Sequence, residues 1–178
     1  MSLAVITGAS SGLGSCYVDA VTKLFPEIDE LWLIARREDR LKEAASKHAD
    51  KRCVIIPMDL SDMKQGDARM LRRFYDLNAG ELAHWVLYTA SDNMAVEELL
   101  LVECSSPEQA ERVLEAARNR KETQVKNFEG YGPEQVQLLN GCVIRRDGSY
   151  VLFAVSDRVS DIKKVYRKDL FQTERTGS

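Results

Sequence analysis

The chain has 178 residues, of which 44% are hydrophobic and 30% are charged, and its formal net charge is -3. These values predict a folded protein of one compact domain or two small ones, and a mildly acidic chain has no general affinity for nucleic acid. Because no apolar stretch reaches the roughly 18 residues that a membrane helix needs, and no basic segment with an apolar core opens the chain, we expect a cytoplasmic protein without a membrane span or signal peptide.

The first third of the chain alternates short apolar runs with helical patterns. Strands are expected over residues 3–6, 31–35 and 53–57. A helix is expected from Ser11 to Leu24, and a second helix ends near His48. Strand, helix, strand, helix and strand in this order predict one mononucleotide-binding half of a doubly wound α/β fold.

The sequence TGASSGLG joins the first strand to the first helix and predicts a phosphate cradle. Gly8 permits the tight turn, Gly12 lets the backbone approach a phosphate, and Gly14 allows the helix to pack closely on the strand. Ser10 and Ser11 offer hydroxyl donors to a phosphate or a ribose.

Two further motifs follow at the ends of the next strands, Ala35-Arg36-Arg37 and Met58-Asp59-Leu60. With the glycine turn, they resemble the N-terminal third of the short-chain dehydrogenase/reductase family. The resemblance implies a partial Rossmann βαβαβ unit over residues 1–62 that binds a nucleotide cofactor. It places these residues at the cofactor: Gly8, Ser10, Ser11, Gly12, Leu13, Gly14, Arg36, Arg37, Asp59 and Leu60.

Arginines stand where a dinucleotide fold for NAD expects an acidic residue on the ribose 2′-hydroxyl. A guanidinium suits a 2′-phosphate, so Arg36 and Arg37 favour NADP(H) over NAD(H). In the family, the position of Asp59 lies beside the adenine. The alternative is that the two arginines form only the solvated start of a helix.

The catalytic signature of that family, Tyr-x-x-x-Lys, is absent, because none of the 6 tyrosines has a lysine four residues later. We therefore expect no catalytic residue in this chain. The sequence Asn78-Ala79-Gly80 matches the family's N-A-G turn, but it follows a helical pattern, and we interpret it as the end of that helix. The scattered cysteines and histidines predict free thiols and no metal site.

The second half, residues 63–178, predicts an α+β sandwich with helices on one face of a mainly antiparallel sheet. After a polar link over residues 61–66, we expect helices over residues 67–77, 106–128, 133–139 and 159–171, and strands over residues 85–89, 98–104, 142–145 and 150–155. The last two strands are predicted to form a hairpin around an Asp-Gly turn.

Several segments of this half, over about residues 67–167, resemble an uncharacterised domain of unknown function found in lipoproteins of Gram-positive gut bacteria. The resemblance implies a fold and no activity. Tyr131, Glu134 and Gln135 are either a ligand site or residues that cap helices and pack a turn. The carrying segments are Val86–Ser91, Met94–Glu98, Phe128–Gln135 and Gly148–Ser156.

Three functions remain open from the sequence. The chain is a nucleotide-binding module fused to an interaction or ligand-binding domain, an active NADP-dependent oxidoreductase completed by another chain, or a fusion with a vestigial cofactor site. The incomplete sheet leaves the outer edge of strand 3–6 bare, so we expect a strand of the second half or a second copy of the chain to cover it.

Overall fold

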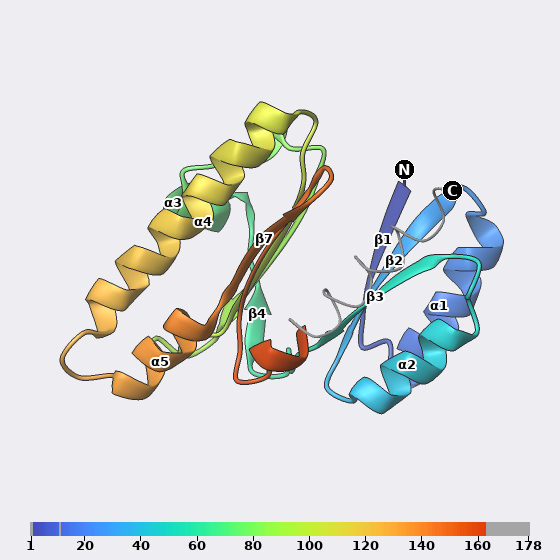
Figure 1. Cartoon of the computed structure of the whole chain (residues 1–178), viewed down its shortest axis with the longest axis horizontal. Coiled ribbons are helices and arrows are strands. Elements are labelled where there is room, and N and C mark those ends of the chain that lie inside the picture. Colours follow the sequence, from blue (N-terminus) through green and yellow to red (C-terminus); the bar gives the residue numbers. More distant parts are fainter. Residues whose placement is uncertain (1, 11, 163–178) are drawn as a thin grey trace, which may run out of the picture. The chain divides into compact units, whose positions relative to one another are not determined.

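The computed structural model of the chain describes residues 2–10 and 12–162 (Figure 1). Its described residues divide into two compact units, one of residues 2–60 with 160–162 and one of residues 61–159. One unit carries a parallel sheet of three strands, and the other carries an antiparallel sheet of five strands. The predicted mixed α/β fold is therefore confirmed at this level. The helix expected over residues 159–171 begins at 159, but its part beyond 162 lies outside the described residues, as does the tail.

The first unit has the βαβαβ order that the sequence predicts. The strand order is β1-β2-β3 with all pairs parallel, and β2 is the central strand, buried from Glu30 to Ala35. Burial of every residue from Leu31 to Ala35, on both faces of the sheet, explains why this part of the sequence is a continuous apolar run rather than an alternating one. The elements are β1 (Ser2–Thr7), α1 (Gly12–Leu24), β2 (Ile28–Ala35), α2 (Glu38–Ser46) and β3 (Arg52–Pro57).

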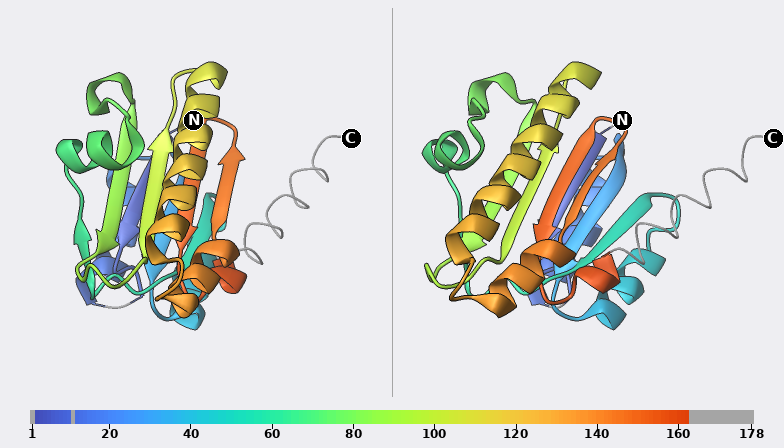
Figure 2. Two further views of the ribbon diagram at one scale, coloured as in Figure 1. Left: turned by 90° about the vertical axis from the view of Figure 1, so that its left-hand side faces the viewer. Right: turned by 60° about the vertical axis from the view of Figure 1, so that its left-hand side comes forward.

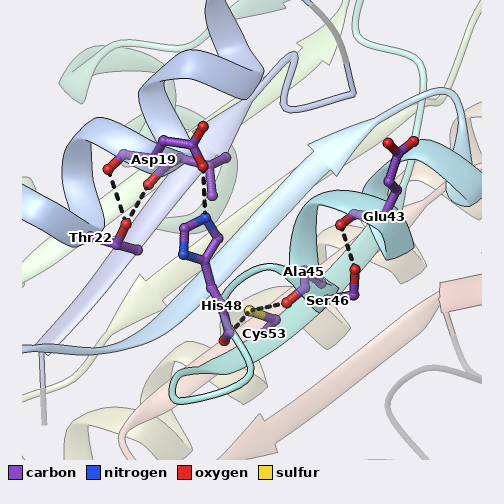
Figure 3. Close-up of polar contacts among 8 residues, drawn as sticks. Asp19, Thr22, Glu43, Ala45, Ser46, His48 and Cys53 are labelled. Atoms are coloured by element: carbon purple, nitrogen blue, oxygen red, sulfur yellow. Dashed lines mark hydrogen bonds and ion pairs between the residues drawn. The ribbon is translucent and has the colours of Figure 1, made fainter.

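Both helices of this unit pack on the sheet through one apolar cluster. Val18 of α1 and Leu41 of α2 contact this cluster, to which β2 contributes Leu31 and Leu33. A polar contact also ties α1 to the loop after α2, since His48 Nε2 lies 3.0 Å from Asp19 Oδ1 (Figure 3).

The second unit is an antiparallel sheet in the order β4-β5-β6-β8-β7 with helices packed on one face (Figures 1 and 2). Leu71 of α3 and Val113 of α4 lie in one core with Leu100 of β6 and Phe153 of β8. The elements are β4 (Met63–Gln65), α3 (Ala68–Tyr75), η1 (Ala79–Glu81), β5 (His84–Ala90), β6 (Glu98–Glu103), α4 (Pro107–Phe128), α5 (Pro133–Gly141), β7 (Val143–Asp147) and β8 (Tyr150–Val155).

The long helix α4 begins where its sequence signals place it. The Ser106 side chain accepts a hydrogen bond from the backbone N–H of Gln109 at 3.2 Å, and Pro107 occupies the first helical position. Serine as N-cap and proline at the first position satisfy or remove N–H groups that would otherwise lack a partner.

Three local predictions were wrong. The link over residues 61–66 contains a strand, β4, which pairs with β5. Helix α3 ends at Tyr75, and the next residue, Asp76, has a left-handed φ of 55°. Asn78 instead caps the turn η1 by accepting from Gly80 N at 3.1 Å. The hairpin loop is Gly148-Ser149, because Asp147 already pairs with Tyr150.

The sequence led us to expect that another strand covers the outer edge of β1. Within the described residues β1 pairs with β2 alone, at the end of its sheet. All five strands of the second half belong to the other sheet. In the part of the chain described here, no helix is long and apolar enough to cross a membrane.

Candidate functional site

The glycine-rich turn between β1 and α1 has the backbone that its sequence predicts. Gly8 has a φ of 69° and Gly12 a φ of 56°, both in the left-handed region that side chains disfavour. A methyl group on Gly14 would lie 2.2 Å from the carbonyl oxygen of Gly8. Gly14 therefore lets the first turn of α1 lie directly against the end of β1.

A pocket of about 360 Å³ lies between this turn and α2. The turn contributes Ser10 and Gly12, and α1 contributes Ser15 and Cys16. The remaining lining comes mainly from α2 and its two flanking residues. The complete set is Ala9, Ser10, Gly12, Ser15, Cys16, Arg37, Arg40, Glu43, Ala44 and Lys47.

The pocket has an excess of positive charge. Arg40 is paired with Glu43 at 2.9 Å, whereas no carboxylate of the described residues lies within 4 Å of Arg37 or Lys47. Arg37 Nη2 donates to the carbonyl oxygen of Ser10 at 3.4 Å, so its guanidinium reaches the glycine turn. Two uncompensated cations beside backbone N–H groups at a helix start form an environment suited to an anion.

The predicted cofactor residues divide into two groups. Ser10, Gly12 and Arg37 line the pocket together. Arg36 does not line it, and its guanidinium instead lies 3.8 Å from the carboxylate of Asp59, with both side chains at least half exposed. Gly8, Gly14 and Leu60 are outside the lining, as is Leu13, whose side chain is 79% exposed. Ser11 lies outside the described residues.

Sequence reasoning missed the contribution of α2 to this pocket. Arg37, Arg40, Ala44 and Lys47 follow one another at intervals of three, four and three residues. This spacing puts their side chains on one face of a helix. The helical pattern was visible in the sequence, and combining it with the arginine motif would have found Arg40 and Lys47.

In the second unit, a buried polar cluster joins α3, β6 and α4. The side chain of Glu98 is 3% exposed and accepts hydrogen bonds from Tyr75 Oη and from the guanidinium of Arg120. Burial, with the Glu98 carboxylate as the next cause, raises the pKa of Tyr75 well above its usual value of 10.0, while Arg120 acts in the opposite direction. Tyr75 therefore stays protonated at neutral pH and is no accessible acid–base group.

The three residues considered as a ligand site do not lie around one pocket. Tyr131 lines a pocket of about 720 Å³ beside the Glu98 cluster. Glu134 and Gln135 line another pocket, of about 530 Å³. In the described part of the chain, no group of three or more His, Cys, Asp or Glu side chains is placed to hold a metal ion.

Comparisons with known proteins bear mainly on the second half. A family model described as "Domain of unknown function (DUF4358)" matches residues 57–156. None of the curated proteins matches the sequence. A solved structure, "Crystal structure of KRED1-Pglu enzyme", aligns at 14% identity over 76% of this chain, which spans 53% of that chain. Its TM-score is 0.30, a likeness too low to support an argument about fold or function.

Proposed function

The chain belongs to the DUF4358 family, a domain of unknown function, and we propose that its first unit is a nucleotide-binding module for the adenosine-phosphate end of NADP(H). The observation that carries the proposal is the pocket at the glycine turn, where Ser10, Gly12 and Arg37 line one cavity. The likeness of the turn and the two strand-end motifs to the short-chain dehydrogenase/reductase family supports the choice of ligand.

The chemistry of this pocket favours a phosphate on the ribose. Arg37 Nη2 lies 3.4 Å from the Ser10 carbonyl oxygen, and Lys47 lines the same pocket. A ribose 2′-phosphate beside Arg37 would gain charge-assisted hydrogen bonds that a 2′-hydroxyl cannot form. We include Arg36, Asp59 and Leu60 in the proposal as residues near the adenosine, because Arg36 directly follows β2 and the other two closely follow β3.

In this proposal the first unit binds NADP(H) but the chain transfers no hydride. The chain has no Tyr-x-x-x-Lys, and Tyr75, the tyrosine with the raised pKa, is 4% exposed and bonded to Glu98. The second unit then acts as an interaction or ligand-binding domain. The competing functions are an NADP-dependent oxidoreductase completed by another chain and a fusion whose cofactor site is vestigial.

We also propose that a second copy of the chain covers the open edge of β1. Bare strand edges pair readily with other strands. The same unit exposes a row of large apolar side chains on and just after α1, which is typical of a contact surface. Their exposed fractions are 79% for Leu13, 61% for Tyr17, 71% for Leu24 and 48% for Phe25.

Titration of NADPH fluorescence tests the cofactor proposal. We expect saturable binding of NADPH and weaker binding of NADH, with an affinity for NADPH that falls about 10-fold or more in Arg37→Ala because a charge-assisted hydrogen bond is lost. Arg118→Ala is the matched control, since Arg118 is an exposed arginine of α4 paired with Glu115.

Three outcomes would separate the alternatives. Equal affinity for NADPH and NADH, or an unchanged affinity in both Arg36→Ala and Arg37→Ala, contradicts the 2′-phosphate assignment. No binding at all indicates a vestigial site. Consumption of NADPH with a panel of carbonyl compounds would show that the chain is an enzyme.

A further inference from the structure

We propose that the 720 Å³ pocket of the second unit binds an uncharged, polyhydroxylated ligand, namely a short oligosaccharide. The pocket is bounded by α3, by α4 and by the loop of residues 91–97 that joins β5 to β6. Its lining includes Thr89, Glu98 and Arg120, whose side chains are largely buried. This site is separate from the glycine turn and does not depend on nucleotide binding there.

Arg120 supplies a rigid donor at the pocket. Its Nε and Nη2 atoms donate to the Glu98 carboxylate at 2.9–3.1 Å, and its guanidinium lies 4.2 Å from the centroid of the Phe74 ring. The Arg120 side chain also interacts with Tyr75, which donates to the same carboxylate. A guanidinium held on one edge and on one face loses little further side-chain entropy when a ligand binds beside it.

Thr89 supplies a second polar group, one without a hydrogen-bond partner among the described residues. Thr89 is 6% exposed, and its Oγ1 forms no hydrogen bond with any residue that the structure describes. Buried hydroxyls are almost always hydrogen-bonded, because an orphaned one costs free energy. A ligand hydroxyl could both donate to and accept from this oxygen.

The charges around the pocket favour a ligand without net charge. Three basic and three acidic side chains line it, so their formal charges cancel, and Arg120 is already compensated by Glu98. Such a pocket does not attract an anion or a cation in preference to a neutral molecule. The basic side chains are Lys64, Arg73 and Arg120, and the acidic ones are Asp92, Glu97 and Glu98.

The uncharged lining suits neighbouring hydroxyl groups. Asn93, Gln124 and Asn127 line it with amide groups, and Asn127 Nδ2 donates to Gln124 Oε1 at 3.2 Å. The Gln124 amide nitrogen and the Asn127 amide oxygen then stand as a donor and an acceptor that adjacent sugar hydroxyls match. Tyr131 adds a flat surface, since it is 59% exposed and its ring is supported by Phe128 at a centroid distance of 5.6 Å. An exposed aromatic ring can pack against the C–H face of a sugar while polar groups bind its edges.

The probes for this site are maltotriose, cellotriose and the trimer of N-acetylglucosamine, each titrated into the ¹⁵N-labelled full chain. We expect saturable shifts of the Thr89, Thr123 and Asn127 amides with at least one trisaccharide. Thr89→Val keeps the shape of the side chain and removes its hydroxyl, so we expect the Kd to rise about 2- to 10-fold while stability to urea is unchanged or higher.

Tyr131→Ala should raise the Kd about 10-fold by removing the aromatic surface. Arg118→Ala, at an exposed residue of α4 outside the pocket lining, should not change it. The proposal is overturned if none of the three trisaccharides shifts these amides saturably at millimolar concentration. It is also overturned if inorganic phosphate or glycylglycine saturates the site more tightly than every trisaccharide, or if Tyr131→Ala and Thr89→Val both bind as the unaltered chain does.

Discussion

Arg120 of α4 forms a bidentate ion pair with the buried carboxylate of Glu98, with Nε 3.1 Å from both oxygens and Nη2 2.9 Å from one of them. Removal of one partner from a buried ion pair leaves an uncompensated charge. We expect Arg120→Ala to lower the free energy of unfolding by about 3–5 kcal/mol in urea titrations.

The double variant Glu98→Leu with Arg120→Met separates the charge from the packing. Because replacing a whole buried pair by apolar side chains is often neutral, we expect it to be more stable than Arg120→Ala. An equal loss of stability in both variants would mean that Arg120 stabilises the fold by the packing of its aliphatic stem rather than by neutralising the charge of Glu98.

The phenol of Tyr75 predicts a loss of stability at alkaline pH. Burial is the main cause that raises its pKa in the folded protein well above 10.0, so the neutral phenol is favoured by folding. By linkage, the stability that the neutral phenol contributes is complete below about pH 10, and it is lost as the pH rises from there toward the pKa of Tyr75 in the folded protein. Urea titrations at successive pH values should show a smaller alkaline loss in Tyr75→Phe, whereas an identical pH profile would exclude Tyr75 as the source.

Gly14 predicts a steric effect that Gly80 lacks. A Cβ at this position would lie 2.2 Å from the Gly8 carbonyl oxygen, whereas a Cβ on Gly80 meets only the Asn78 side chain at 3.6 Å. We expect Gly14→Ala to cost about 1–3 kcal/mol, and Gly80→Ala to change stability far less. Thermal or urea unfolding of the two variants measures the difference, and similar values would contradict the close contact of α1 with the turn.

The thiols offer an independent test of the glycine-turn pocket. Cys16 is exposed and lines this pocket, whereas Cys104 is buried. Burial raises the pKa of the Cys104 thiol, and the positive charge of Arg146 opposes this rise without cancelling it. Because the thiolate is the reactive form, we expect a maleimide to label Cys16 long before Cys104. NADPH should slow the labelling of Cys16 and not that of Cys104, as read by mass spectrometry; equal slowing of both would indicate a global effect.

Self-association through the first unit can be measured by light scattering after size-exclusion chromatography. We expect a dimer that dissociates when Tyr17 and Leu24 are both changed to glutamate, since charges on an apolar contact surface oppose its burial. Met94→Glu is the control, because Met94 is a 60% exposed apolar side chain of the second unit. A monomer at all concentrations would contradict the proposed dimer.

The sequence predicted the elements whose signals are local and strong. Ser106 and Pro107 marked the start of α4, and the continuous apolar run of β2 marked a buried strand. Strand β4 was missed because it has three residues, Met63–Gln65, and pairs on one side alone. So short an edge strand shows no alternation of apolar and polar residues. Asn78 was misread because an asparagine both ends helices and begins turns, and only the backbone shows which.

The site was harder to predict than the fold. The glycine spacing identified the turn, but the adjacency of Arg37 and Arg36 in the sequence does not reveal that only Arg37 lines the pocket. Successive residues around a helix start point in different directions, so position in a motif does not fix direction. The Glu98 cluster depends on Tyr75, Glu98 and Arg120 from three elements, and such long-range pairing leaves no pattern in one sequence.

The order β4-β5-β6-β8-β7 also has a consequence for how the second unit folds. The β5–β6 and β7–β8 pairs join neighbours in the sequence, the latter through Gly148-Ser149, so each hairpin can form rapidly by itself. The β6–β8 pairing closes a large loop that contains α4 and α5, and its entropic cost is met only when both hairpins dock. We expect the joining of the two hairpins, rather than the formation of either, to limit the folding rate.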